Sequence, residues 1–177
     1  WGSGTGDWGS GIGNGVFQGE GLYGIIERMN NREIAQRFEQ IADMLAIRGD
    51  QVHRVLAYRR AAENIRELDR DLGRLRSEGD LTDLPGIGPA LANKIEEMLD
   101  TGELDYFNRL SEDVPPSLVA WLRVDGMGPK RVKQIHDSLG ITTLEELAAA
   151  AEAGELRSLP GLGAKSEAKL VAGIQAL

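Results

Sequence analysis

Three short stretches of this chain place two glycines, one residue apart, directly in front of a run with helical spacing. They read LPGIGPALANKI from residue 84, VDGMGPKRVKQI from residue 124 and LPGLGAKSEAKL from residue 159. Three occurrences in one frame predict a repeated tight turn between two helices, in which both glycines adopt conformations closed to other residues. The apolar residue between the glycines is expected to plug the turn into the helix pair; these residues are Ile87, Met127 and Leu162.

Phosphate binding is the chemistry that such turns can perform. The first amides of a helix have no partner inside the helix, and the helix dipole favours an anion at that end. Backbone donors at the three turns therefore form candidate anion sites, centred on the glycine pairs Gly86 and Gly88, Gly126 and Gly128, and Gly161 and Gly163.

The net charge of −8 argues against a nucleic-acid partner, because phosphates attract lysine and arginine. Backbone amides carry no formal charge, however, and acidic residues are absent from the windows 51–62, 84–95, 126–136 and 156–166. These windows predict a surface from which acids are kept away, although tight turns could also simply exclude bulky charged residues. The cations in the windows include Arg54, Arg59, Lys94, Lys130, Arg131 and Lys165.

The elements that hold these turns are predicted to be helical. Apolar residues recur at helical spacing in residues 34–45, 52–65 and 72–75. Thr143 and Glu146 form a capping box for a later helix. No segment shows the alternation of a β-strand, so the expected fold is all-α.

Composition narrows the class of protein further. The 177 residues include no cysteine, which excludes disulfide scaffolds and cysteine zinc sites. No apolar run reaches the roughly 20 residues of a membrane span, and no signal peptide is recognisable. We therefore expect a cytoplasmic monomer without membrane contact. Residues 1–28 are glycine-rich and are predicted to be a leader that is disordered or not native.

The three turns resemble helix-hairpin-helix motifs, which bind the DNA backbone without reading its sequence. The order of segments from NREIAQRFEQIADML through HRVLAYRRAA to LPGLGAKSEAKL further resembles the N-terminal region of family X DNA polymerases, especially bacterial ones. AYRRAA and LPGIG carry the most specific part of this likeness. The resemblance implies a lyase-like helical domain with the first hairpin over residues 29–112, followed by a fingers-like domain with the second and third hairpins over residues 113–177.

The resemblance also implies roles for individual residues. The hairpin carbonyls that hold Na⁺ or K⁺ in this family correspond to Leu84, Ile87, Val124 and Met127. The nucleophile of 5′-deoxyribose-phosphate lyases, a lysine that forms a Schiff base with the sugar aldehyde, corresponds to Lys94.

The 5′-phosphate pocket of that lyase falls on His53, Arg54 and Tyr58, with Arg59 beside it. Two positions that carry auxiliary lysines in the polymerase-beta branch are Ala90 and Tyr106 here. The phosphate pocket is therefore poorer in charge, and the resemblance leaves lyase activity open.

Three functions follow as alternatives. The chain is expected to bind gapped, nicked or abasic DNA near the bacterial nucleoid as part of a repair polymerase, to act as a lyase through Lys94 without a cofactor, or to serve as a helical protein-interaction module. Nucleotidyl transfer needs Mg²⁺ on paired aspartates of a palm domain, which the resemblance places beyond Leu177, so polymerisation by this chain is not expected.

Overall fold

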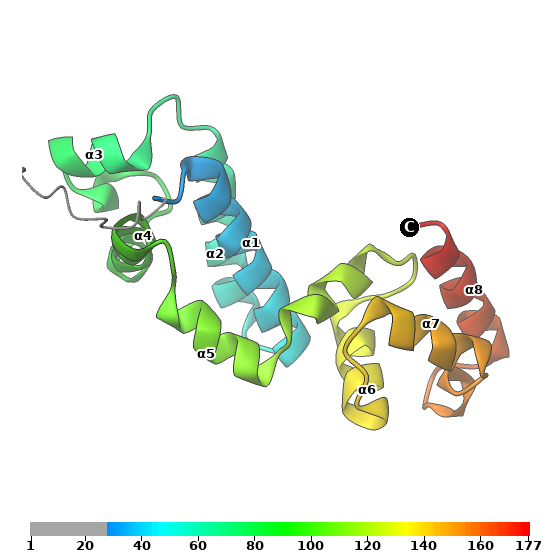
Figure 1. The fold of residues 1–177 in the computed structure, drawn as a ribbon. Coiled ribbons are helices and arrows are strands. Elements are labelled where there is room, and N and C mark those ends of the chain that lie inside the picture. Colours follow the sequence, from blue (N-terminus) through cyan, green and yellow to red (C-terminus); the bar gives the residue numbers. More distant parts are fainter. Residues whose placement is uncertain (1–27) are drawn as a thin grey trace, which may run out of the picture.

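The computed structural model describes residues 28–177, and the predicted leader falls almost wholly outside this range. Within it the chain is helical and contains no strand, which confirms the all-α prediction (Figure 1). The helices of the first half are α1 (Asn31–Arg48), α2 (Val52–Arg66), α3 (Leu72–Glu78), the 3₁₀ turn η1 (Leu81–Asp83), α4 (Pro89–Thr101) and α5 (Asp105–Asp113). Those of the second half are η2 (Pro116–Arg123), α6 (Pro129–Leu139), α7 (Leu144–Glu152), η3 (Leu156–Ser158) and α8 (Ala164–Gln175).

Helix α1 is the central element of the core. Its apolar stripe, which includes Ile34, Phe38, Ile41 and Leu45, is fully buried, because helical spacing brings these side chains onto one face. This helix packs mainly on α2 and also contacts α5, η2 and α6. Both halves of the chain therefore rest on the same helix.

The helix ends follow the local sequence. Asn30 and Glu33 form a capping box at the start of α1, and Gly49 ends the helix in the left-handed conformation. The predicted capping box of α7 is confirmed, because the amide of Glu146 donates to the Thr143 hydroxyl at 3.2 Å and the Glu146 carboxylate accepts from the Thr143 amide at 3.0 Å. No described helix is long and apolar enough to cross a membrane.

Candidate nucleic-acid interface

The three glycine pairs form the same turn before α4, α6 and α8; we call residues 84–88, 124–128 and 159–163 hairpins 1, 2 and 3. In each hairpin, the amide of the residue between the glycines donates to the carbonyl three residues earlier, at 3.0–3.1 Å. The side chains of these middle residues are 3%, 5% and 1% exposed, in the order Ile87, Met127 and Leu162. The predicted plug between the two helices is thus confirmed.

The two glycines of a hairpin differ in conformation. The first has a positive φ in every hairpin, +74° at Gly86, +83° at Gly126 and +74° at Gly161, which favours glycine. The second has φ between −81° and −99° with ψ near 170°, an extended backbone that any residue adopts. The prediction that both glycines need special conformations is therefore wrong for the second one.

Space around the second glycine is also open. A Cβ atom added at Gly88, Gly128 or Gly163 would meet no heavy atom within 4 Å. Each of these glycines is the N-cap of the following helix, and the chain before it has already turned. The fold itself requires glycine at the first position and not at the second.

The amides at the hairpins are available to a ligand. Helices α4 and α6 begin with proline, which has no N–H. In both helices the next amide, and the amide of the N-cap glycine, donate to no other residue of the described chain; these four are Gly88, Ala90, Gly128 and Lys130. Exposed donors at a helix N-terminus are suited to an anion.

Hairpins 2 and 3 contact one another reciprocally. The side-chain amide of Gln134 in α6 donates to the backbone carbonyl of Pro160 in hairpin 3 at 2.7 Å. Lys169 of α8 pairs with Asp125 of hairpin 2 at 3.2 Å. Each contact runs from the sixth residue after the second glycine to the residue before the partner's first glycine. A groove between the two hairpins is lined by Gly126, Gly128, Lys130, Arg131, Gln134, Pro160 and Gly161.

Some of the predicted cations form an ion pair or a hydrogen bond with the described chain, and others do not. Lys130 and Lys165 are exposed and form no ion pair with a described residue. The Arg131 guanidinium instead donates to the Gly126 carbonyl at 2.7 Å. Arg59 pairs with Asp43 at 3.0 Å. Of these four predicted cations, Lys130 and Lys165 are therefore free to bind a phosphate.

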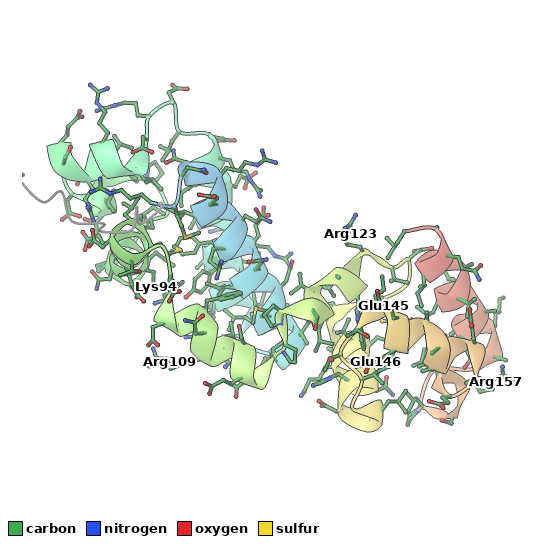
Figure 2. The ribbon with its side chains drawn as sticks, in the orientation of Figure 1. Lys94, Arg109, Arg123, Glu145, Glu146 and Arg157 are labelled. Carbon is green, nitrogen blue, oxygen red and sulfur yellow. The ribbon has the colours of Figure 1, made fainter. Side chains whose placement is uncertain are left out.

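Asp125 and Glu167 directly adjoin windows that contain no acidic residue. Asp125 lies inside hairpin 2, and Glu167 lies at the start of α8 with only 2% exposure. The Glu167 carboxylate accepts from the Arg157 amide at 2.9 Å and from its Nε at 2.8 Å (Arg157 is labelled in Figure 2). The prediction of an acid-free surface is therefore wrong at hairpin 2, where the exposed Asp125 directly precedes the window, whereas Glu167 is buried and adds no acidic group to the surface.

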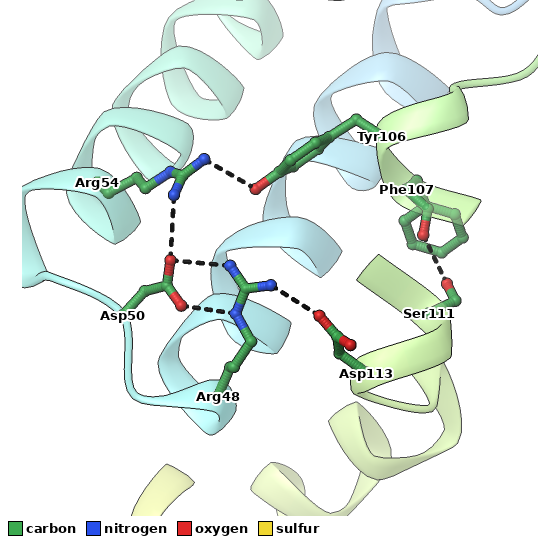
Figure 3. A network of polar contacts seen from close by, with 7 residues as sticks. All are labelled: Arg48, Asp50, Arg54, Tyr106, Phe107, Ser111 and Asp113. Atoms are coloured by element: carbon green, nitrogen blue, oxygen red, sulfur yellow. Dashed lines mark hydrogen bonds and ion pairs between the residues drawn. The ribbon is translucent and has the colours of Figure 1, made fainter. Parts of the chain in front are cut away.

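A second cluster in the first half brings three residues of the predicted lyase site, Arg54, Tyr58 and Lys94, to Tyr106. The Arg54 guanidinium donates to the Tyr106 hydroxyl at 3.3 Å and pairs with Asp50 at 3.3 Å (Figure 3). The ring of Tyr58 stacks on that of Tyr106 with 6.2 Å between centroids. Tyr58 is 5% exposed, and its burial raises the pKa of the hydroxyl, so Tyr58 belongs to the core.

Lys94 approaches the same tyrosine from α4. Its ammonium lies 4.8 Å from the centre of the Tyr106 ring and 3.4 Å from the Ala90 carbonyl. Partial burial lowers the pKa of Lys94, the charges of Arg54 and Arg109 lower it further, and Glu97 opposes them. Figure 2 labels Lys94 and Arg109 near one another on the lower side of the first half.

His53 does not join this cluster, since its side chain is exposed and contacts no described polar group. Tyr106, by contrast, stands at the centre, although sequence reasoning treated it only as a lost lysine. An aromatic residue at a position that the resemblance reserves for a cation was the available signal. Among residues 28–177, no three His, Asp or Glu side chains gather closely enough to hold a metal ion.

Comparison with known proteins agrees with this architecture. The sequence matches the family models described as a helix-hairpin-helix domain over residues 29–104 and as a SAM-like helix-hairpin-helix tandem over residues 120–176. These ranges separate hairpin 1 from the reciprocally packed hairpins 2 and 3.

Two curated relatives carry the same region. The DNA polymerase/3'-5' exonuclease PolX of Bacillus subtilis is 32% identical over 143 residues, which are 81% of this chain and 25% of that protein. DNA polymerase lambda of Rattus norvegicus is 26% identical over 117 residues, 66% of this chain and 19% of its own length. The chain thus spans a quarter or less of the length of these relatives. With both halves matched as helix-hairpin-helix units, the chain belongs to the bacterial family X DNA polymerases and corresponds to their helix-hairpin-helix region.

Proposed function

We propose that this chain binds the DNA backbone, without reading base sequence, through the free amides of its hairpins. The observation that carries the proposal is the second glycine of each hairpin, which has ordinary backbone angles and open space around it. The fold gives no reason for a glycine there. A phosphate that must come close to the backbone does give one, because a Cβ atom would stand in its way.

Gapped or nicked DNA is the proposed form of the ligand. Helix α4 with hairpin 1 lies in one half of the elongated molecule, and α6 and α8 with hairpins 2 and 3 lie in the other (Figure 1). Two separate backbone sites suit two stretches of duplex that flank an interruption. The printed names of the relatives, both DNA polymerases, support DNA as the partner.

A monovalent cation at the hairpins is part of the proposal. The carbonyls of Ile87 and Met127 accept no hydrogen bond from a described residue, and those of Leu84 and Val124 each accept one and keep a second lone pair. Uncharged carbonyl oxygens suit Na⁺ or K⁺. The fit is better at hairpin 1, because Arg131 already places a positive charge on a carbonyl of hairpin 2.

A pair of alanine variants tests the proposal that hairpin amides bind phosphate, which we call the amide model. Gly128→Ala adds a methyl group at an unstrained position, so it should leave the melting temperature unchanged and weaken binding to a fluorescein-labelled gapped duplex by about tenfold, the loss of roughly one charge-assisted hydrogen bond. The control is Ser138→Ala, an exposed change at the far end of α6 that leaves both properties unchanged. Parent-like affinity of Gly128→Ala would refute the amide model.

A lyase activity is favoured as a second function by the environment of Lys94. The lowered pKa of Lys94 increases the fraction of its amine that is neutral, and Arg54 lies nearby to attract a 5′-phosphate. In the proposed step the Lys94 amine attacks the C1′ aldehyde of an incised abasic end, and water leaves as the Schiff base forms. Loss of a C2′ proton then breaks the C3′–O bond and releases the strand with a 5′-phosphate, and hydrolysis of the Schiff base frees Lys94 and the unsaturated sugar phosphate. The open alternative of a protein-interaction module has no such local observation.

Borohydride trapping tests this second function. The parent chain should form a covalent complex with an incised abasic duplex, and Lys94→Arg should lose it while keeping DNA affinity, because arginine preserves the charge but forms no Schiff base. Equal trapping by Lys94→Arg would assign the chemistry to another amine. An untrapped parent chain would show that only the binding function is present.

A further inference from the structure

Hairpin 2 contains a carboxylate whose negative charge repels the proposed phosphate ligand. Asp125 occupies the position that is proline in hairpins 1 and 3, directly before Gly126. Its side chain is 76% exposed, and the free amides of Gly128 and Lys130 follow within the same turn. A negative charge this close repels a phosphate that approaches those amides.

Lys169 faces this carboxylate from another part of the chain. Its Nζ lies 3.2 Å from Oδ2 of Asp125. The end of its side chain, from Cδ to Nζ, lies 3.7–3.8 Å from the point where a Cβ atom of Gly126 would stand. Lys169 therefore lies along hairpin 2, although it belongs to the helix that follows hairpin 3.

Packing of α8 against hairpin 2 fixes this arrangement. One turn after Lys169, Gly173 brings the helix so close that an added Cβ would stand 3.0 Å from Cγ1 of Val124 and 3.1 Å from the amide nitrogen of Asp125. Only glycine permits this approach without a shift of the neighbouring backbone. The position of the Lys169 ammonium thus follows from close contact between α8 and hairpin 2.

We propose that Lys169 is a positioning residue for hairpin 2, which neutralises Asp125 so that a DNA phosphate can reach the amides of that hairpin. The inference rests on the proposed binding of the DNA backbone. It adds that α8, the helix after hairpin 3, supports phosphate binding at hairpin 2. Lys169 acts through Asp125 and does not itself bind the phosphate. The same register position holds Gln134 in α6, an uncharged residue that contacts the uncharged Pro160 carbonyl.

A double-mutant cycle on the full chain tests the inference, with the affinity for a fluorescein-labelled duplex containing a single-nucleotide gap as the readout. Lys169→Met should weaken binding by about three- to tenfold at low salt, because it exposes the Asp125 charge to the phosphate, and the loss should shrink as salt rises. Asp125→Asn should bind at least as tightly as the parent. The double variant Asp125→Asn with Lys169→Met should return to the affinity of Asp125→Asn alone.

Control variants separate the possible outcomes. Lys133→Met removes the lysine of another exposed Lys–Asp pair, with Asp137, and should change affinity by less than about twofold. An equal loss from Lys169→Met in both Asp125 backgrounds would make Lys169 a direct phosphate ligand and overturn the inference. Parent-like binding by Lys169→Met, beside weakened binding by Gly128→Ala, would overturn the inference alone. Parent-like binding by both variants would overturn the proposed function as well.

Discussion

The first glycine of each hairpin has a backbone conformation that favours glycine, and the second does not. Hairpin 3 shows this difference most clearly. Gly161 has φ +74°, and Gly163 has φ −81°, while neither would bring an added Cβ within 4 Å of another atom. Gly161→Ala should therefore lower the free energy of unfolding by about 1–2 kcal/mol through backbone strain alone. Gly163→Ala should leave it unchanged or raise it by up to about 1 kcal/mol, because alanine restricts the unfolded chain.

Urea unfolding followed by circular dichroism measures this difference. The two variants add the same methyl group two residues apart, so each is the control for the other. Equal stability of the two would mean that the first glycine is not held in the left-handed conformation in solution, and the distinction between the two positions would be lost.

At the scale of elements, the third hairpin is held by a buried carboxylate that hairpins 1 and 2 lack. The position of Glu167, four residues after the second glycine, is Ala92 in α4 and Val132 in α6. Burial alone would raise the pKa of Glu167, but hydrogen bonds from Arg157 and its charge outweigh burial, and the net shift is downward from 4.5. The carboxylate ties η3 to the first turn of α8.

The direction of this shift predicts how the stability of the chain depends on pH. A carboxyl whose folded pKa is lowered stabilises the fold fully above its unfolded pKa, and this stabilisation is lost as pH falls through the folded pKa. Glu167→Gln should therefore lower the melting temperature clearly at pH 7. The difference from the parent should narrow as pH falls below the unfolded pKa, near 4.5, and through the lower folded pKa. A difference independent of pH would show that shape and hydrogen bonding matter there and charge does not.

Much of the element structure could be predicted because it depends on local sequence. Helical spacing identified α1 and α2, and the capping box identified the start of α7. The conformation of Gly128 could not be predicted, because the motif alone does not say which of its glycines carries the turn. Local sequence determines where a helix begins. Whether a position in the turn requires glycine depends instead on its backbone angles, which the motif alone does not reveal.

For the whole molecule, contacts between distant segments decided what sequence reasoning missed. The pairing of Lys169 with Asp125 joins residues that no local window contains together. Tyr106 likewise comes from α5 to meet Arg54 of α2 and Lys94 of α4. Tertiary packing determines these neighbours, so composition and spacing predicted the types of residue at the sites more reliably than their partners.

The salt dependence of DNA binding tests the charge distribution of the whole molecule. The chain carries a net charge of −8, Arg54, Arg59 and Arg157 are held in ion pairs, and the proposed donors are neutral amides. Because few counterions are released when amides bind phosphates, the logarithm of the binding constant should fall with the logarithm of KCl concentration with a slope of only about −2 to −3 between about 50 and 200 mM. Anisotropy titrations of a gapped duplex measure this slope.

Lys130→Met should make the slope shallower by up to about one unit if that free lysine meets a phosphate. A slope near that of a protein that neutralises many phosphates would mean that lysines and arginines, and not hairpin amides, hold the DNA.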